Sequence, residues 1–192
     1  MSTTTASAYF SDSLILTSSE SARLVQLSSP SYTTLIYRGS RDGLNRTSWH
    51  SKCDNVTNTV TIILNNLNYV LGGYTSIGFS TVSSSRYLND TSAYIFSLRQ
   101  GANATNGFKF TIFVSAHALY LSASARQALC SYVGSYYCDI ACGLDNSFYF
   151  SDFGASYNLP AGYNWSYSAA RSYLAGSYSS RTTSEMEVCK IY

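Results

Sequence analysis

The stretch "IYRGSRDGLNRTSWHSKCDN", residues 36–55, raises the main question about this chain. It contains four basic residues together with Asp42, His50 and Cys53, although charged residues make up only 11% of the chain. Such a mixture fits three interpretations: an active site, a metal site, or a structural corner where a strand gives way to a helix. The rest of the sequence has to decide between them.

The length and charge of the chain set the first limits. A chain of 192 residues predicts a single domain, residues 1–192. The 12 basic and 10 acidic residues are too evenly balanced to predict a nucleic-acid partner. Ser, Thr and 18 tyrosines take the place of charged residues. A neutral, hydroxyl-rich surface is typical of a secreted protein, a carbohydrate binder or a subunit of an assembly.

The sequence gives conflicting indications of the compartment in which the protein is found. No run of residues approaches the ~20 apolar residues that span a bilayer, which predicts no membrane insertion. Residues 1–13 lack the pattern of a secretory signal, so we expect a flexible segment and a cytoplasmic protein. The alternative is an extracellular protein, because its charge is low and N-x-[ST] triplets begin at Asn45, Asn55, Asn89, Asn103 and Asn164.

Hydrophobic periodicity predicts a mainly β fold with a few helices. A capping box at residues 17–20 predicts a helix that ends before Pro30, and a second helix is expected at 44–53. Residues 83–90 and 100–107 are predicted to be loops. Strands are predicted at 33–38, 59–65, 69–75, 93–98, 108–114, 119–122, 147–150 and 185–191. Many strands joined by short turns favour a two-sheet antiparallel β-sandwich flanked by short helices.

Two details of the strands carry further predictions. Val60, Ile62 and Leu64 alternate with other residues, which is typical of a β-strand. Gly72 and Gly73 interrupt the next strand and indicate either a bulge or a close approach of the backbone.

The search for catalytic chemistry finds no complete constellation. His50 and His117 are the only histidines and lack metal-ligand spacing, so we expect no metal and no cofactor. His50 and Cys53 share a helix face as a base and a nucleophile would, but no third member is evident, and packing is favoured. His117 is interpreted as a hydrogen-bonded histidine at the start of a strand.

The acidic residues allow catalytic and structural interpretations. Glu185 and Glu187 lie on one face of a predicted terminal strand, either as paired catalytic acids or as a solvated face that protects a sheet edge. The edge interpretation is favoured. Arg41 and Asp42 either form a solvated ion pair or, as we favour, Asp42 fixes the turn that Gly43 completes before the helix.

The five cysteines leave their oxidation state open. Cys130, Cys138 and Cys142 cluster with a C-x7-C-x3-C spacing that does not match a zinc site. Buried thiols are favoured, and one disulfide within the cluster is the alternative.

Six motifs in order resemble the TLDc domain family. The opening 35–55 is similar to its S-R-D-G and H-x-K-C-D segments, and the later motifs are "TVTIIL" (59–64) with "YVLGGYTS" (69–76), "SAYIFSL" (92–98), "SAHALYLS" (115–122), "FSDFGASY" (150–157) and "LAGS…SEMEVCKIY" (174–192). Ala116 and Ala118 depart from the family's G-H-D around His117. Residues 123–143 look like an insert that the family lacks.

The resemblance implies a two-sheet antiparallel β-sandwich and motif residues that serve as scaffold. On this interpretation the stretch 36–55 is a corner of the scaffold. The scaffold residues would be Arg41, Asp42, Gly43, His50, Cys53, Asp54, Gly72, Gly73, Tyr74, His117, Gly154, Glu185 and Glu187.

The resemblance also implies a function, and the composition of the chain suggests alternatives to it. It implies a non-enzymatic adaptor that protects against oxidative stress or binds the vacuolar proton-pumping ATPase (V-ATPase). The low-charge surface favours an alternative, a lectin-like carbohydrate binder or extracellular interaction protein, with Tyr132, Tyr136 and Tyr137 as the expected ligand contacts. Such a surface also predicts self-association into a homo-oligomer. An enzyme is the least favoured class.

Overall fold

The computed structural model shows a mainly β protein with short helices, as predicted. It describes residues 9–121, 126–129, 139–143, 147–149, 153–164, 168–176 and 181–192. All pairs between the named strands in these ranges are antiparallel. No described helix is both long enough and apolar enough to cross a bilayer.

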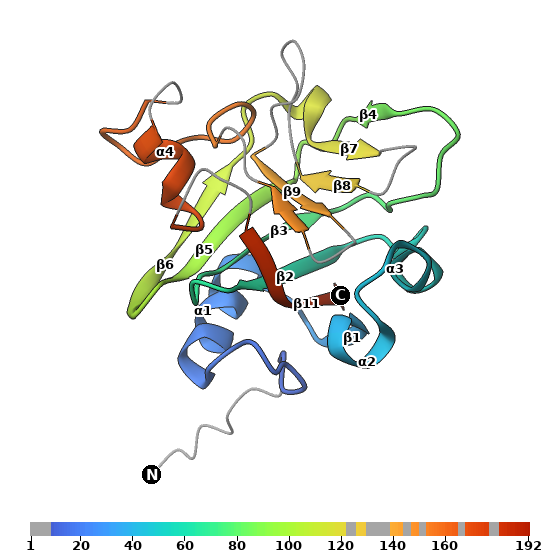
Figure 1. Cartoon of the computed structure of the whole chain (residues 1–192), viewed down its shortest axis with the longest axis horizontal. Coiled ribbons are helices and arrows are strands. Elements are labelled where there is room, and N and C mark those ends of the chain that lie inside the picture. Colours follow the sequence, from blue (N-terminus) through green and yellow to red (C-terminus); the bar gives the residue numbers. More distant parts are fainter. Residues whose placement is uncertain are drawn as a thin grey trace.

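The first sheet contains six strands. Its order is β1 (Thr33–Arg38), β11 (Arg181–Ile191), β2 (Thr59–Asn65), β3 (Val70–Thr75), β5 (Tyr94–Gln100) and β6 (Asn103–Thr111). The last strand of the chain therefore lies inside the sheet, because β11 pairs with β1 on one side and with β2 on the other (Figure 1).

The second sheet is attached to the first through the start of β11. Its order is β4 (Arg86–Leu88), β7 (Leu119–Leu121), β8 (Arg126–Leu129), β9 (Ile140–Gly143) and β10 (Ser147–Tyr149). Arg181 and Thr182 of β11 pair with β10, whereas residues 183–190 pair with β2. One strand thus belongs to both sheets.

The main core fills the space between the two sheets. Ile63, Leu71 and Ile95 of the first sheet belong to the same buried cluster as Leu119 and Leu121 of the second. The helices α2 (Gly39–Asp42), α3 (Arg46–Cys53), η1 (Ser115–His117) and α4 (Ser168–Tyr173) complete the domain.

The other face of the first sheet is also covered, by α1 (Ser18–Ser28) and the segment before it (Figure 1). Phe10 and Leu24 join Val60, Ile62 and other residues in a second buried cluster. Both faces of β2 are therefore buried, because the helix and the second sheet cover opposite faces. Phe10 lies in the segment 1–13, which was expected to be flexible, and is 4% exposed.

The predicted capping box of α1 is confirmed. The Glu20 amide donates to Oγ1 of Thr17 (3.3 Å), and the Thr17 amide donates to Oε2 of Glu20 (2.8 Å). The helix ends at Ser28. The next residue, Ser29, caps it with a left-handed φ of 48° and lies directly before Pro30. Local sequence alone sets both ends of this helix.

Three local predictions were wrong, one of them because pairing with a distant strand overrode local preference. The polar loop 83–90 contains β4, whose Arg86 pairs with Leu121. The segment 100–107 is mostly strand, since β6 begins at Asn103 after a tight turn at Gly101 (φ 65°). The strand predicted at 108–114 ends at Thr111.

Residues 123–143 are part of the second sheet where the structure describes them. They supply β8 and β9, which link β7 to β10. The predicted ligand contacts Tyr132, Tyr136 and Tyr137 lie outside the described residues, as do Cys130 and Cys138.

Candidate functional site

The corner at residues 36–55 is built from β1, α2 and α3. Arg41, Asp42 and Gly43 do not form a simple turn: the first two end the helical turn α2, and Gly43 follows with φ 94°. Oδ2 of Asp42 accepts the Arg38 amide at 2.9 Å, so the prediction that Asp42 binds the backbone is confirmed. Asn45, which accepts the Ser48 amide, caps α3 instead.

The alternative interpretation, an ion pair between Arg41 and Asp42, is also present. Nη2 of Arg41 lies 2.7 Å from Oδ2 of Asp42, and the Arg41 side chain is 46% exposed. Hydrogen bonds from the Arg41 guanidinium lower the pKa of Asp42 to about 2. An exposed pair contributes little stability, so Asp42 matters mainly for its backbone contact.

His50 and Cys53 serve packing and hydrogen bonding within the corner. Nδ1 of His50 lies 2.6 Å from Oδ1 of Asp54, whose Oδ2 accepts the amide and hydroxyl of Thr81, both at 2.8 Å. Cys53 is 1% exposed, and burial raises the pKa of its thiol. A nucleophilic cysteine requires the opposite shift, so the geometry supports the scaffold interpretation.

Glu185 and Glu187 do not form a solvated edge, and that prediction was wrong. β11 lies between two strands, and the two side chains are 9% and 0% exposed. Glu185 accepts the Ser40 amide at 3.1 Å. Glu187 accepts Nε of Arg38 (2.8 Å), the Ser13 hydroxyl (2.5 Å) and the Leu14 amide (2.8 Å). Together they fasten the corner and the N-terminal segment to the sheet.

The residues of the Gly-Gly-Tyr-Thr-Ser motif, 72–76, also make contacts within the domain. A Cβ atom on Gly72 would lie 1.9 Å from the Thr61 carbonyl oxygen, so the close-approach alternative holds. The Tyr74 hydroxyl donates to Asn58 at 3.0 Å. Asp90, which sequence reasoning missed, is 3% exposed and accepts the Thr75 hydroxyl and the Ser76 amide.

Asp139 is a second acidic residue that the sequence did not reveal. Its fully buried carboxylate accepts the amides of Gly154 (2.8 Å), Ala155 (3.1 Å) and Ser156 (3.0 Å). Gly154 has φ 107°, which suits glycine. Burial raises the pKa of Asp139 to about 7, while these amides act in the opposite direction. Asp139 therefore organises the segment 153–157.

The remaining predicted site residues have similarly local roles. His117 ends η1, just before β7, and its half-buried ring lies 4.8 Å from that of Tyr87. Cys189 is 2% exposed, and burial raises the pKa of its thiol to about 12. Within the described ranges, no group of three or more His, Cys, Asp or Glu side chains is arranged to hold a metal ion.

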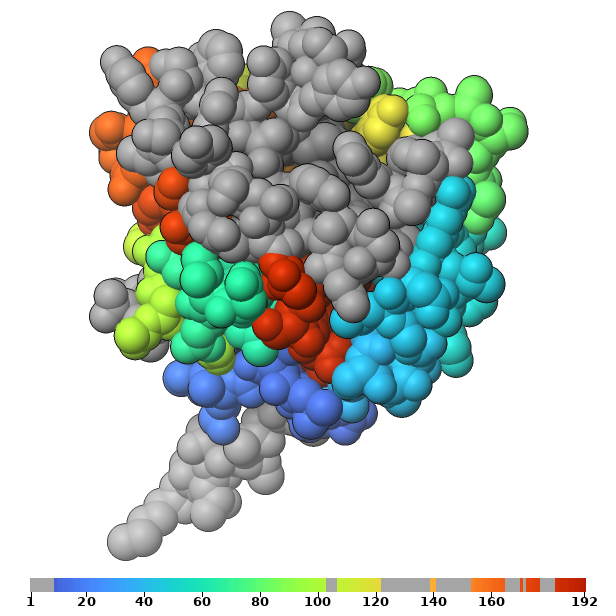
Figure 2. Space-filling view, viewed as in Figure 1, coloured from blue at the N-terminus to red at the C-terminus, as the bar shows by residue number. Residues whose placement is uncertain are grey.

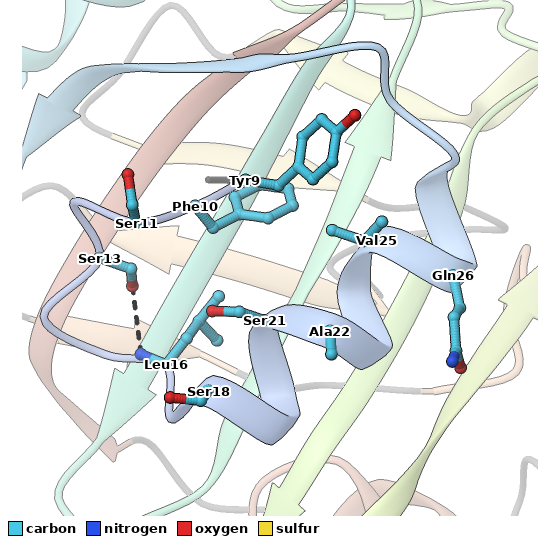
Figure 3. A pocket seen from close by; sticks show the side chains of 10 residues that line it. All are labelled: Tyr9, Phe10, Ser11, Ser13, Leu16, Ser18, Ser21, Ala22, Val25 and Gln26. Carbon is cyan, nitrogen blue, oxygen red and sulfur yellow. Dashed lines mark hydrogen bonds between the residues drawn. The ribbon is translucent and has the colours of Figure 1, made fainter. Parts of the chain in front are cut away.

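A pocket of about 550 Å³ lies between the N-terminal segment and α1 (Figure 3). Figure 3 shows the Tyr9 and Phe10 rings on the segment side and Val25 on the helix side. In the space-filling view, this blue region lies beside β11 and the 36–55 corner (Figure 2). The lining residues are Tyr9, Phe10, Ser11, Ser13, Leu16, Ser18, Ser21, Ala22, Val25 and Gln26.

The pocket is lined without charge. Its ten lining residues are aromatic, aliphatic, hydroxyl or amide side chains. Two charged side chains of α1 have partners outside the lining: Glu20 pairs with Arg99 at 2.6 Å, and Arg23 donates to the Gly107 carbonyl at 2.9 Å. Sequence reasoning missed this site because residues 1–13 were expected to be flexible. The adjacent rings of Tyr9 and Phe10, next to a capped helix, were the available signal.

The chain is an antiparallel two-sheet domain whose motif side chains hold its own loops. Comparison with known families makes the assignment specific: the model of the TLDc domain matches residues 9–190. The chain therefore belongs to the TLDc domain family. A search among curated proteins found no match.

Proposed function

We propose that this TLDc-domain protein is a non-enzymatic adaptor that binds a protein partner. The partner suggested by the family is the V-ATPase, and the associated role is protection against oxidative stress. Membership of the TLDc family supports the partner and the protective role, and the geometry of the motif residues supports a non-enzymatic protein.

One observation carries the proposal: the acidic side chains that could act as catalytic acids or bases form hydrogen bonds within the protein. Asp42, Asp90 and Glu185 each accept a backbone amide, and Glu187 accepts both an amide and a guanidinium. A catalytic acid or base must reach substrate. Side chains that bind backbone amides or another side chain of the same protein favour a structural role. The surface is then the part of the protein that interacts with partners.

The burial of Cys53 and Cys189 bears on how the protein could protect against oxidative stress. Burial raises the pKa of both Cys53 and Cys189, which disfavours the thiolate that reacts with oxidants. We therefore propose that protection does not require these two thiols. Cells that carry the Cys53→Ala, Cys189→Ala variant should survive peroxide as well as cells with the unmodified protein.

Capture of purified V-ATPase on the immobilised chain tests the adaptor role. Retention of pump subunits, and a change in pump assembly when the chain is added, would support it. The chain denatured in urea and then immobilised serves as the control for nonspecific capture. Equal retention by the folded and denatured chain, or none by either, would contradict the proposal.

A second candidate function is the binding of a neutral carbohydrate, and two observations favour it. Of the eight acidic residues that the structure describes, five are buried, so the described surface is poorer in negative charge than the composition suggests: Glu20, Asp90, Asp139, Glu185 and Glu187. The pocket next to α1 also combines aromatic rings with hydroxyl groups.

A further inference from the structure

We propose that the pocket between the N-terminal segment and α1 binds a neutral saccharide through one pyranose ring. The proposal rests on the second candidate function and gives it a location. Three features of the pocket carry it: its shape, its unpartnered hydroxyl groups and its lack of charge.

The size and the walls of the pocket suit a sugar ring. Its volume of about 550 Å³ lies within the range of small-ligand sites, about 300–1,000 Å³. The Tyr9 ring is half-buried, and Phe10 beneath it is anchored by its amide, which donates to Oγ1 of Thr33 at 2.8 Å. A fixed aromatic ring offers a flat apolar face to the C–H face of a pyranose.

Hydroxyl groups on both walls supply the polar contacts. In the part of the chain that the structure describes, the hydroxyls of Ser11, Ser18 and Ser21 make no hydrogen bond, although all three line the pocket. Each hydroxyl is both donor and acceptor, which matches the hydroxyls of a sugar. Ser13 is excluded from this role, because it already binds Glu187 and the Ile15 and Leu16 amides.

The neutral lining selects against charged ligands. Moving an ion into a pocket without a counter-charge costs more than moving a neutral polar molecule that finds hydrogen-bond partners. The Gln26 amide adds a polar group at the rim, with its oxygen accepting Nη1 of Arg23 at 3.0 Å. Ser11 and Ser18 are exposed and Ser21 is half-buried, so water can reach these hydroxyls. A saccharide that displaces this water can replace its hydrogen bonds, whereas a hydrocarbon cannot, so a saccharide fits better.

The test is a titration of the full-length chain followed by amide NMR spectra. The probes are glucose, mannose, galactose and N-acetylglucosamine, with toluene as an apolar probe. We expect at least one sugar to shift the amides of residues 9–26 in a saturable way. Shifts from toluene with none from any sugar would overturn the proposal, as would the absence of any saturable shift.

Matched variants locate the site. Ser21→Leu places a branched side chain in the pocket on a helix that tolerates leucine, and Ser19→Leu makes the same change on α1 at a residue that does not line the pocket. The first should weaken sugar affinity by about tenfold or more, and the second should change it by less than about twofold. Equal affinities would overturn the assignment.

Two further measurements keep the result interpretable. Tyr9→Ala removes the stacking ring and should weaken the affinity comparably, so a folding defect in one variant does not decide the outcome. Capture of V-ATPase by Ser21→Leu should equal that of the unmodified chain. Sugar binding and pump capture can therefore fail independently.

Discussion

The buried ion pair between Arg38 and Glu187 leads to the sharpest prediction about stability. Arg38→Gln removes the guanidinium that lies 2.8 Å from a carboxylate with no exposed surface. The carboxylate keeps the Ser13 hydroxyl and the Leu14 amide but loses its counter-charge. Removing one partner of a buried pair costs about 3–5 kcal/mol. Because Arg38 is 14% exposed, we expect the lower end of this range, about 3 kcal/mol.

Urea unfolding followed by circular dichroism measures this loss. For a domain of this size, a loss of about 3 kcal/mol corresponds to a melting temperature lower by about 6–12 °C. The matched control is Arg41→Gln, which makes the same substitution three residues away. Arg41 is 46% exposed in its pair with Asp42, against 14% for Arg38 in its pair, so the expected loss is below about 1 kcal/mol.

The comparison of these two variants decides whether burial sets the energy of the pair. A loss for Arg38→Gln no greater than that for Arg41→Gln would refute the reasoning. It would mean that Glu187 is sufficiently stabilised by neutral donors alone. A large loss for both would instead show that the corner as a whole depends on its arginines.

Three further predictions test the close packing and the buried groups. Gly72→Ala should lower the free energy of unfolding by about 3 kcal/mol or more, because the added Cβ would clash with the backbone. Gly162→Ala is the control: it has open space around it but a φ of 87°, and it should lower the free energy of unfolding in urea by about 1 kcal/mol. The raised pKa of Asp139 means that the folded state binds its proton more tightly than the unfolded state, so stability should fall by about 2–3 kcal/mol from pH 5 to pH 8. Asp139→Asn should lack this component. Iodoacetamide should label Cys53 and Cys189, as mapped by peptide mass, only after denaturation; rapid labelling of the folded chain would contradict their burial.

The sequence predicted the strands of the first sheet best, because their signals are local. The hairpin of β2 and β3 and the capped helix α1 follow from nearby residues. The prediction missed β4 for the opposite reason: this strand has only three residues, of which Arg86 is exposed and none is fully buried, and it is paired with the distant strand β7. Local preference cannot report a partner that is more than thirty residues away.

The acidic residues of β11 show a different limit. Strand alternation correctly places Glu185 and Glu187 on one face. It does not reveal that β1, some 150 residues earlier in the chain, pairs with β11 on the side that was expected to be an open edge. Arg38 lies opposite Glu187 in this pairing. An acidic residue on a strand is therefore ambiguous until the neighbouring strand is known.

The pocket and the scaffold motif are physically connected through Glu187. Its carboxylate binds Arg38 at the corner and also Ser13 and Leu14 of the segment that forms one wall of the pocket. Phe10 of the same segment is held in the core beneath α1. The wall is therefore fixed from the interior before any ligand arrives, which reduces the ordering cost of binding. A residue that serves only as scaffold can thus influence recognition: Arg38→Gln should weaken sugar binding in the pocket even at temperatures where the domain stays folded, whereas Arg41→Gln should not.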